Sequence, residues 1–388
     1  MPGRATLVVM LGGVSGGPLE SLLRQALEVS ALDSIEIALE SGHFERALLL
    51  ADRALDEAPP AGVTVELDRD HSPGGSHSLV DSSSGDFHFG RRLGDAVAEH
   101  RIERLLYLGA GSAPLLGADE FGALADGVAG EAPACLTNNF FSADLFALAP
   151  ARLVAALDPP PDADNSVPRR LRQEHGVEVE ELPRTAATQL NIDSPVDMVA
   201  LALSGRAGGR LGAVLDRWAP STESMARAAM TFIDRDAEVL IAGRVSSRTW
   251  QHLERETACR VRLLAEERGM SAAGRDAGGS ARSLLGRLLL AVGPAQFFGA
   301  VLPELCDAAF IDTRPLLSQL GLHPSRADRF AADLGLVDEI EDRRLRELVE
   351  AAAASPVPVV MGGHSLVAGV LMLLGDWAWE QHDRALGL

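Results

Sequence analysis

The chain of 388 residues contains no lysine, so all 35 of its basic residues are arginine. This absence excludes a Schiff-base lysine, and it excludes the lysine that contacts phosphate in a Walker P-loop. Any phosphate group must therefore be held by arginine side chains, by backbone N–H groups or by a metal ion.

Cysteine and net positive charge are also scarce. Cys135, Cys259 and Cys306 are far apart and form no CxxC pair, which is typical of reduced thiols in a cytoplasmic protein rather than of a disulfide framework or a zinc site. The formal charge of −20 argues against nucleic-acid binding, which needs a basic surface. We therefore expect a cytoplasmic protein without nucleic-acid partners, and an assembly of identical subunits stays open.

One stretch, residues 357–379, is apolar enough and long enough to be compared with a membrane span. Near its start it reads Gly362-Gly363-His364-Ser365, which is typical of a turn between a strand and a helix. We expect no membrane span there and no secretory signal at the beginning of the sequence.

Strand-like and helix-like blocks alternate along the chain, which predicts an α/β protein with mostly parallel sheets and helices on both faces. In the first half we expect strands at 6–11, 34–41, 63–67, 104–111, 132–139 and 177–182, with helices at 19–29, 46–55 and 89–100. In the second half we expect strands at 238–243, 261–267, 308–314 and 356–363. Near residues 204–222 the alternation of strands and helices gives way to a stretch that contains Gly, Ser and Pro. This predicts a first domain at 1–205, a linker at 206–222 and a second, Rossmann-like α/β domain at 223–388.

Four stretches of the first half carry a family likeness: LGGVSGG (11–17), GDFHFGRRLGDAV (85–97), LLYLGAGSAPLL (105–116) and QLNIDSPVDMVAL (189–201). Through them, residues 5–203 resemble the GT-A-type nucleotidyltransferases. That group includes the molybdenum-cofactor guanylyltransferases, the phospholactate guanylyltransferases and the "glycosyltransferase A" transferases beside them. The resemblance implies a GT-A fold that binds a nucleotide or a phosphorylated metabolite and transfers a nucleotidyl or glycosyl group.

The resemblance also implies roles for particular residues. Backbone N–H groups of a glycine-rich turn would wrap the phosphates, because glycine allows the backbone to approach closely. This nucleotide-binding set comprises Gly12, Gly13, Ser15, Gly16, Arg91 and Ser112. Asn191 and Asp193 would hold Mg²⁺.

The sequence departs from the family at three points. Gly17 stands where the family has a loop arginine, no lysine follows, and Ser112 replaces the aspartate that binds metal. A simpler interpretation of the turn is a tight strand–helix connection, and Ser194 or Asp193 could cap a helix that begins at Pro195. The Ser/Gly-rich stretch 71–87 is expected to be a long surface loop, and metal binding by His71, His77 and His88 or by Asp68-Arg69-Asp70 is a weaker alternative.

The second half has polar residues after each of its four predicted strands. Because the carboxyl ends of parallel strands meet at one edge, we expect these residues to form one anion site. Its binding set comprises Arg244, Ser246, Arg268, Arg314, Gly363 and Ser365, and its acid/base candidates are Asp312, His364 and Glu267. The alternative is structural: Asp312–Arg314 and Glu267–Arg268 ion pairs, and a helix cap at His364.

Three functions are compatible with these patterns. The chain is a nucleotidyltransferase-like enzyme, or a transferase fold without a full catalytic set that binds a metabolite and leaves any activity to the second domain, or an assembly protein. Mg²⁺ is the cofactor that the first of these implies.

Overall fold

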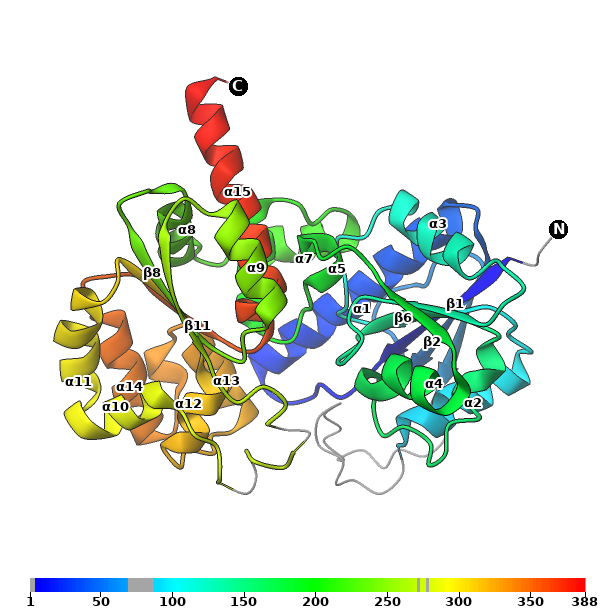
Figure 1. The fold of residues 1–388 in the computed structure, drawn as a ribbon, viewed down its shortest axis with the longest axis horizontal. Coiled ribbons are helices and arrows are strands. Elements are labelled where there is room, and N and C mark those ends of the chain that lie inside the picture. Colours follow the sequence, from blue (N-terminus) through cyan, green and yellow to red (C-terminus); the bar gives the residue numbers. More distant parts are fainter. Residues whose placement is uncertain (1–3, 69–86, 271–272, 277–278, 388) are drawn as a thin grey trace. The chain divides into compact units, whose positions relative to one another are not determined.

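A computed structural model describes residues 4–68, 87–270, 273–276 and 279–387. The chain forms two compact units, and each is described by itself (Figure 1). The first unit comprises residues 1–15, 24–189 and 209–211, and the second comprises 16–23, 190–208 and 212–388. Residues 190–205, which the sequence places in the first domain, thus have their contacts in the second unit, as do residues 206–208 of the predicted linker. The predicted loop at 71–87, including His71 and His77, lies outside the described residues except for Phe87, and Arg69 and Asp70 before it lie outside them as well.

The first unit is built on a seven-stranded sheet with the order β3-β2-β1-β4-β6-β5-β7. Strand β6 runs antiparallel to β4 and β5, and the other pairings are parallel. The strands are β1 (Ala5–Leu11), β2 (Phe44–Ala51), β3 (Val63–Leu67), β4 (Leu105–Gly109), β5 (Ala134–Thr137), β6 (Leu145–Ala149) and β7 (Glu178–Glu181). The mixed, mostly parallel α/β sheet that the sequence predicts is therefore present.

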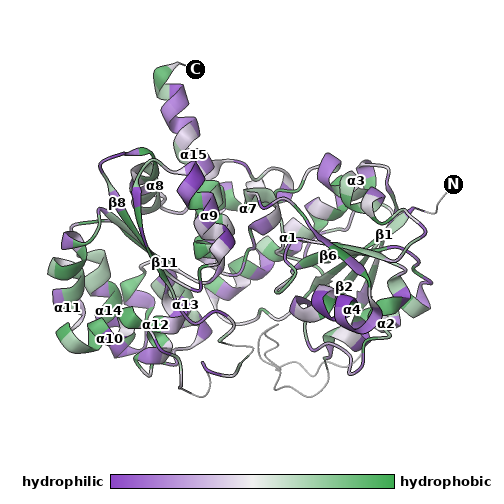
Figure 2. Ribbon diagram, in the orientation of Figure 1, coloured by the Kyte–Doolittle hydropathy of each residue, from purple (hydrophilic) through white to green (hydrophobic). Residues whose placement is uncertain are grey.

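Burial on both faces explains why the central strand β1 is apolar except for Thr6. All seven of its residues are buried, as expected for a parallel strand covered on two sides. Val8 and Met10 share one core with Phe89 and Leu93 of helix α2 (Phe89–Glu99). In contrast, helix α4 (Val167–His175) is mostly hydrophilic in Figure 2 and buries only its Val167, Pro168 and Leu171 side.

Two predicted elements near the start of the chain were wrong. Residues 34–41 belong to helix α1 (Pro18–Glu40), not to a strand, because Leu23, Leu27, Ala31 and Ile35 recur every four residues and are all buried. The helix expected at 46–55 is instead strand β2, in which a continuous apolar run is buried on both faces. Strand β6 was not anticipated. The remaining helices of this unit are α3 (Ala118–Gly127) and α5 (Ala186–Gln189).

The second unit contains an all-parallel, four-stranded sheet with the order β11-β10-β8-β9. Its strands are β8 (Glu238–Gly243), β9 (Arg260–Ala265), β10 (Ala308–Asp312) and β11 (Val359–Gly362). Its helices are α6 (Pro195–Ser204), α8 (Glu223–Met230), α9 (Ser247–Glu256), α10 (Leu284–Val292), α11 (Pro294–Gln296), α12 (Thr313–Gln319), α13 (Arg326–Asp333), α14 (Arg343–Ala353) and α15 (Gly369–Leu386). This is the second α/β fold that the sequence predicts.

The predicted linker at 206–222 contains a helix, α7 (Gly209–Trp218). The apolar stretch 357–379 divides into strand β11, a short turn and the start of α15. Among the helices that the structure describes, none is by itself long and apolar enough to cross a membrane, and one bent pair, Leu284–Val292 with Pro294–Glu304, passes that test only jointly.

Gly90, in the first turn of α2, is required by a close approach of the chain. Its N–H donates to the carbonyl of Pro161, and an added Cβ would lie 2.4 Å from Pro161 Cδ and 2.7 Å from the Pro161 backbone. We expect Gly90→Ala to lower the free energy of unfolding by about 1–3 kcal/mol, the usual cost of overpacking. Gly130→Ala is the matched control because nothing lies within 4 Å of its added Cβ. Urea unfolding of both variants measures the difference, and equal stabilities would contradict the packing argument.

Candidate functional site

Each sheet has a position where the connections of two neighbouring strands lead in opposite directions, and several of the predicted site residues follow the strands there. In the first unit the reversal lies between β1 and β4, and in the second between β8 and β10. Ligands of open α/β sheets bind outside the carboxyl ends of the strands at this reversal. The glycine-rich turn and Ser112 follow β1 and β4, whereas Arg244 and Asp312 follow or end β8 and β10.

In the first unit, the glycine-rich turn is occupied by a carboxylate from the end of β2. The N–H of Gly13 donates to Asp52 Oδ2 over 3.1 Å, and Arg24 Nη2 contacts Asp52 Oδ1 at 2.9 Å. The position of an added Cβ on Gly12 lies 3.4–3.5 Å from Asp52 side-chain atoms. The Arg24 side chain is fully buried, and 18% of the Asp52 side chain is exposed. Sequence reasoning missed Asp52, which no motif distinguishes from other acidic residues.

The rest of the predicted nucleotide set is dispersed. Ser15 is exposed, and Gly16 belongs to the second unit, where its left-handed backbone at φ +148° lets Glu20 pack against it. Arg91 is exposed. Its neighbour Arg92 forms ion pairs with Glu66 and Asp68 at 3.0 and 2.9 Å.

Ser112 is buried in a tight turn after β4. Its N–H donates to the carbonyl of Gly109, and its Oγ lies 2.9 Å from where a Cβ on Gly109 would stand. The packed Ser112 hydroxyl therefore serves the structure of the turn. It supplies no charge for a metal ion.

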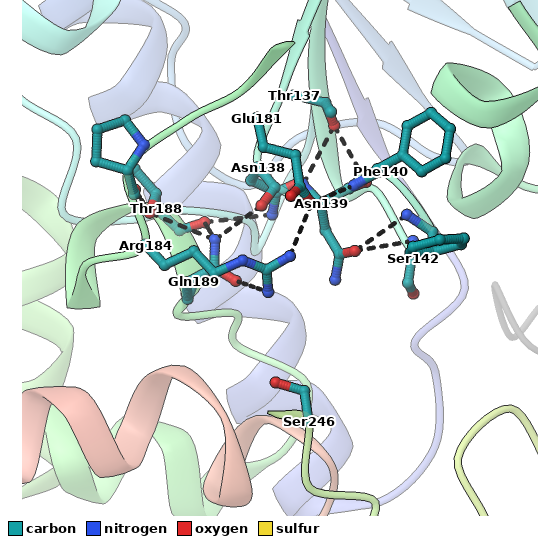
Figure 3. Close-up of polar contacts among 12 residues, drawn as sticks. Thr137, Asn138, Asn139, Phe140, Ser142, Glu181, Arg184, Thr188, Gln189 and Ser246 are labelled. Carbon is teal, nitrogen blue, oxygen red and sulfur yellow. Dashed lines mark hydrogen bonds and ion pairs between the residues drawn. The ribbon is translucent and has the colours of Figure 1, made fainter. Parts of the chain in front are cut away.

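A hydrogen-bond network fixes the loops after β5 and β7 of the first unit (Figure 3). The buried Asn138 side chain accepts from the N–H groups of Asp144 and Leu145 and donates to the carbonyl of Thr188. Arg184 bridges Glu181 and Gln189, and Gln189 donates to the carbonyl of Asn138. Sequence reasoning missed this network because its members come from separate segments.

In the second unit, Arg244 and Asp312 form a two-point ion pair at the strand reversal. Arg244 Nε contacts Asp312 Oδ2 at 2.6 Å, and Nη2 contacts Oδ1 at 3.1 Å. The N–H groups of Arg244 and Arg314 also donate to this carboxylate. Burial alone raises the pKa of Asp312, but Arg244 outweighs it, and the pKa of Asp312 lies below its usual range. Asp312 is therefore ionised at neutral pH, and it orients Arg244.

A second two-point pair lies beside the first. Arg314 Nη2 contacts Asp333 Oδ2 at 2.6 Å and Nη1 contacts Oδ1 at 3.1 Å, while Nη1 also donates to Thr313 Oγ1. Both carboxylate side chains have no exposed area, whereas 19% of Arg244 and 18% of Arg314 is exposed. The two buried carboxylates thus hold two arginine side chains, each of which is about one-fifth exposed. The Asp312–Arg314 ion pair considered from the sequence is replaced by these two pairs.

The other strand ends contribute differently. Glu267 pairs with Arg275 at 2.7 Å, not with its neighbour Arg268, and its backbone is left-handed at φ +51°. Arg268 is exposed. His364 makes no side-chain cap bond, and desolvation, followed by the charge of Arg244, lowers the pKa of its imidazole to about 4.

The stretch 191–197 belongs to this unit as well. Ser365 Oγ donates to the carbonyl of Asn191, and the charge of exposed Asp193 interacts with both Arg244 and Arg314. Ser246 caps α9 by accepting from the N–H of Thr249. A Cβ added to Gly363 would lie 3.8 Å from Arg314 Nη2. The second unit therefore brings together Asp193, Arg244, Arg268, Asp312, Arg314, Gly363, His364 and Ser365.

Ser194 caps helix α6, as the structural interpretation of this stretch predicted, and it does so together with Asp197. The Asp197 carboxylate accepts from the N–H groups of Asp193 and Ser194 and from Ser194 Oγ. Burial, followed by the charge of Asp193, raises the pKa of Asp197 well above its usual range. Sequence reasoning missed Asp197, although Ser194 and Asp197 have the three-residue spacing of a capping box.

The residues that the resemblance assigns to Mg²⁺ fit that ion poorly. Asn191 Oδ1 is buried without a hydrogen-bond partner among the described residues, and Asp193 faces two guanidinium groups. Mg²⁺ prefers carboxylates together with phosphate oxygens. Within the described ranges, no group of three His, Cys, Asp or Glu side chains could hold a metal ion. Mg²⁺ stays a prediction from the resemblance.

Comparison with known proteins gives structural similarity only. No protein-family model and no curated protein matches the sequence. A candidate nucleotide-diphospho-sugar transferase from Desulfovibrio desulfuricans G20 is 10% identical, with a TM-score of 0.38 over 55% of this chain and 94% of its own. A cytidylyltransferase from Leptospira borgpetersenii is 16% identical, with a TM-score of 0.36 over 56% of this chain and 93% of its own.

A third similar structure is CMP:2-keto-3-deoxy-manno-octonic acid synthetase in complex with CTP. It is 14% identical, with a TM-score of 0.27 over 46% of this chain and 90% of its own. These solved structures are nucleotidyltransferases and sugar transferases, the class of protein that the sequence resembles.

The Arg244–Asp312 pair predicts a specific stability pattern. Arg244→Met leaves a buried carboxylate without its cation, and we expect the free energy of unfolding to fall by about 3–5 kcal/mol. Adding Asp312→Asn removes the orphaned charge and keeps an acceptor for the N–H of Arg314, so the double variant should regain much of this loss. Urea unfolding of the single and double variants measures it. A double variant less stable than Arg244→Met would contradict the pairing.

Asp197 predicts a pH dependence of stability. Because its folded pKa is raised above the unfolded value of about 3.9, its contribution is full below that value and is lost as pH rises through the folded pKa. Asp197→Asn cannot ionise, so the stability of the wild type relative to this variant should fall as pH increases from 4 to 8. Urea unfolding across this range tests the prediction, and a constant difference would refute it.

Proposed function

We propose that this chain binds a phosphorylated small molecule, a nucleotide or a phosphorylated metabolite, at the carboxyl edge of the second unit's sheet. The observation that carries the proposal is the pair of partly exposed arginine side chains, Arg244 and Arg314, that two fully buried carboxylates hold at the strand reversal. Arginine is the only basic residue type in the chain, and its fork of donors suits phosphate oxygens.

The Arg244 guanidinium has one side for the protein and one for the ligand. Asp312 takes Nε and Nη2 of Arg244, so the Nη1 group faces away from this pair. Asp333 instead holds Arg314 end-on through both Nη1 and Nη2, and Nη1 also donates to Thr313, so Arg314 contributes its positive charge rather than a free Nη group. The first N–H groups of α9, capped by Ser246, and the positive charge of exposed Arg268 add to the attraction for an anion.

Two exposed groups beside the guanidinium pair are the acid/base candidates of this proposal. Asp193 and His364 are exposed, and each interacts electrostatically with Arg244. Asp312 and Glu267 are held in ion pairs and are assigned positioning parts instead. The sequence resemblance of residues 5–203 favours a nucleotide as ligand and transfer of a nucleotidyl or glycosyl group as the reaction.

The proposal predicts metal-independent binding that depends on Arg268. In EDTA, we expect inorganic phosphate, CTP, GTP or glucose 1-phosphate to raise the melting temperature. Arg268→Ala should lower the affinity for whichever probe stabilises the wild type about three- to tenfold, because an exposed charge near the site contributes on the order of 1 kcal/mol. Without ligand, the melting temperature of the Arg268→Ala variant should equal that of the wild type.

Arg255→Ala is the matched control, since Arg255 is exposed at the other end of α9. Isothermal titration calorimetry gives the affinities of the three proteins. Equal weakening by both substitutions, or no binding of any of the four probes by the wild type, would contradict the proposal.

A further inference from the structure

The glycine-rich turn of the first unit already contains an anion, and that anion is part of the chain. One oxygen of Asp52 accepts from the N–H of Gly13, and the other accepts from Arg24. A ligand phosphate in a glycine turn is bound in the same way, by a backbone N–H group on one side and a guanidinium on the other. The carboxylate lies against Gly12 as well, at the distance of ordinary contact for an added Cβ.

Arg24 is the group that makes this turn more than a tight connection. Its side chain has no exposed area, and its Nε and Nη1 atoms have no hydrogen-bond partner among the described residues. A buried guanidinium with unused donors costs free energy, and an additional acceptor would satisfy it. Burial lowers the pKa of Arg24, and the charge of Asp52 opposes that effect most strongly.

The residues around Arg24 explain why Asp52, rather than a free anion, lies in the glycine turn. Besides Asp52, the charges that act on Arg24 are those of Glu28, Asp56 and Arg53. Glu28 accepts from the N–H groups of Asp56 and Glu57, which holds the chain after β2 against helix α1. Asp52 is therefore presented to the turn by a fixed segment, and it loses no translational freedom on binding, unlike a free anion.

We propose that Asp52 is an internal substitute for a ligand phosphate, and that removing its carboxylate opens a polyphosphate site formed by the Gly12–Gly13 backbone and Arg24. The glycine turn thus keeps the shape of a phosphate loop while the chain itself fills it. This inference concerns the first unit and is independent of the anion site proposed for the second.

The test is a gain of binding. Inorganic pyrophosphate is titrated by calorimetry into the wild type, Asp52→Ala and Asp56→Ala, with folding checked by circular dichroism. We expect Asp52→Ala to bind one more pyrophosphate per chain than the wild type does. If the wild type also binds this additional pyrophosphate, the variant should bind it at least about tenfold more tightly. Asp56→Ala removes a neighbouring negative charge without touching Gly13, so it should behave as the wild type does.

Two further variants make the result specific. Arg24→Met combined with Asp52→Ala should lose the added site, whereas Arg268→Ala combined with Asp52→Ala should keep it, which separates this site from that of the second unit. If Asp52→Ala unfolds, Asp52→Asn replaces it, and pyrophosphate should promote refolding of either variant. A folded Asp52 variant without the additional site, or variants that pyrophosphate neither binds nor refolds, would overturn the proposal.

Discussion

Burial of carboxylates is the constraint on which both candidate sites depend. An ionised carboxylate without exposed area must be paired with a cation and hydrogen-bonded, since its desolvation otherwise costs on the order of several kcal/mol. In a chain without lysine, every such cation other than histidine is an arginine. Asp312 and Asp333 satisfy this requirement by holding Arg244 and Arg314, and the same interaction aims those two guanidinium groups.

The same interaction has the opposite consequence in the first unit. There the arginine is the fully buried partner, and the carboxylate is partly exposed and lies in the glycine turn. Under the two proposals above, Arg24 holds Asp52 in the place of a phosphate, whereas Asp312 holds Arg244 where a phosphate would bind. Two sheets with comparable strand reversals thus differ in the sign of the charge that they present at the reversal.

Short polar networks complete the positioning of these loops. Asn138 connects the loop after β5 with the segment that follows β7, and Ser365 connects Asn191 to the turn after β11. Asp197 ends the stretch 191–197 by accepting the N–H groups of Asp193 and Ser194. The backbone is in this way fixed by side chains next to the exposed groups Asp193 and His364, which leaves those groups available for a ligand.

The sequence by itself determined the fold class, most strands, and the gathering of polar residues at strand ends, because apolar periodicity and turn residues are local properties. It failed at 34–41 and 46–55, where helical and strand periodicities overlap in short apolar runs. Only the tertiary structure decided which charges meet: Arg244 with Asp312, Arg314 with Asp333, Glu267 with Arg275, and Asp52 with the glycine turn. The physical reason is that Coulomb attraction and burial depend on distances between elements, and the spacing of residues along the chain does not contain those distances.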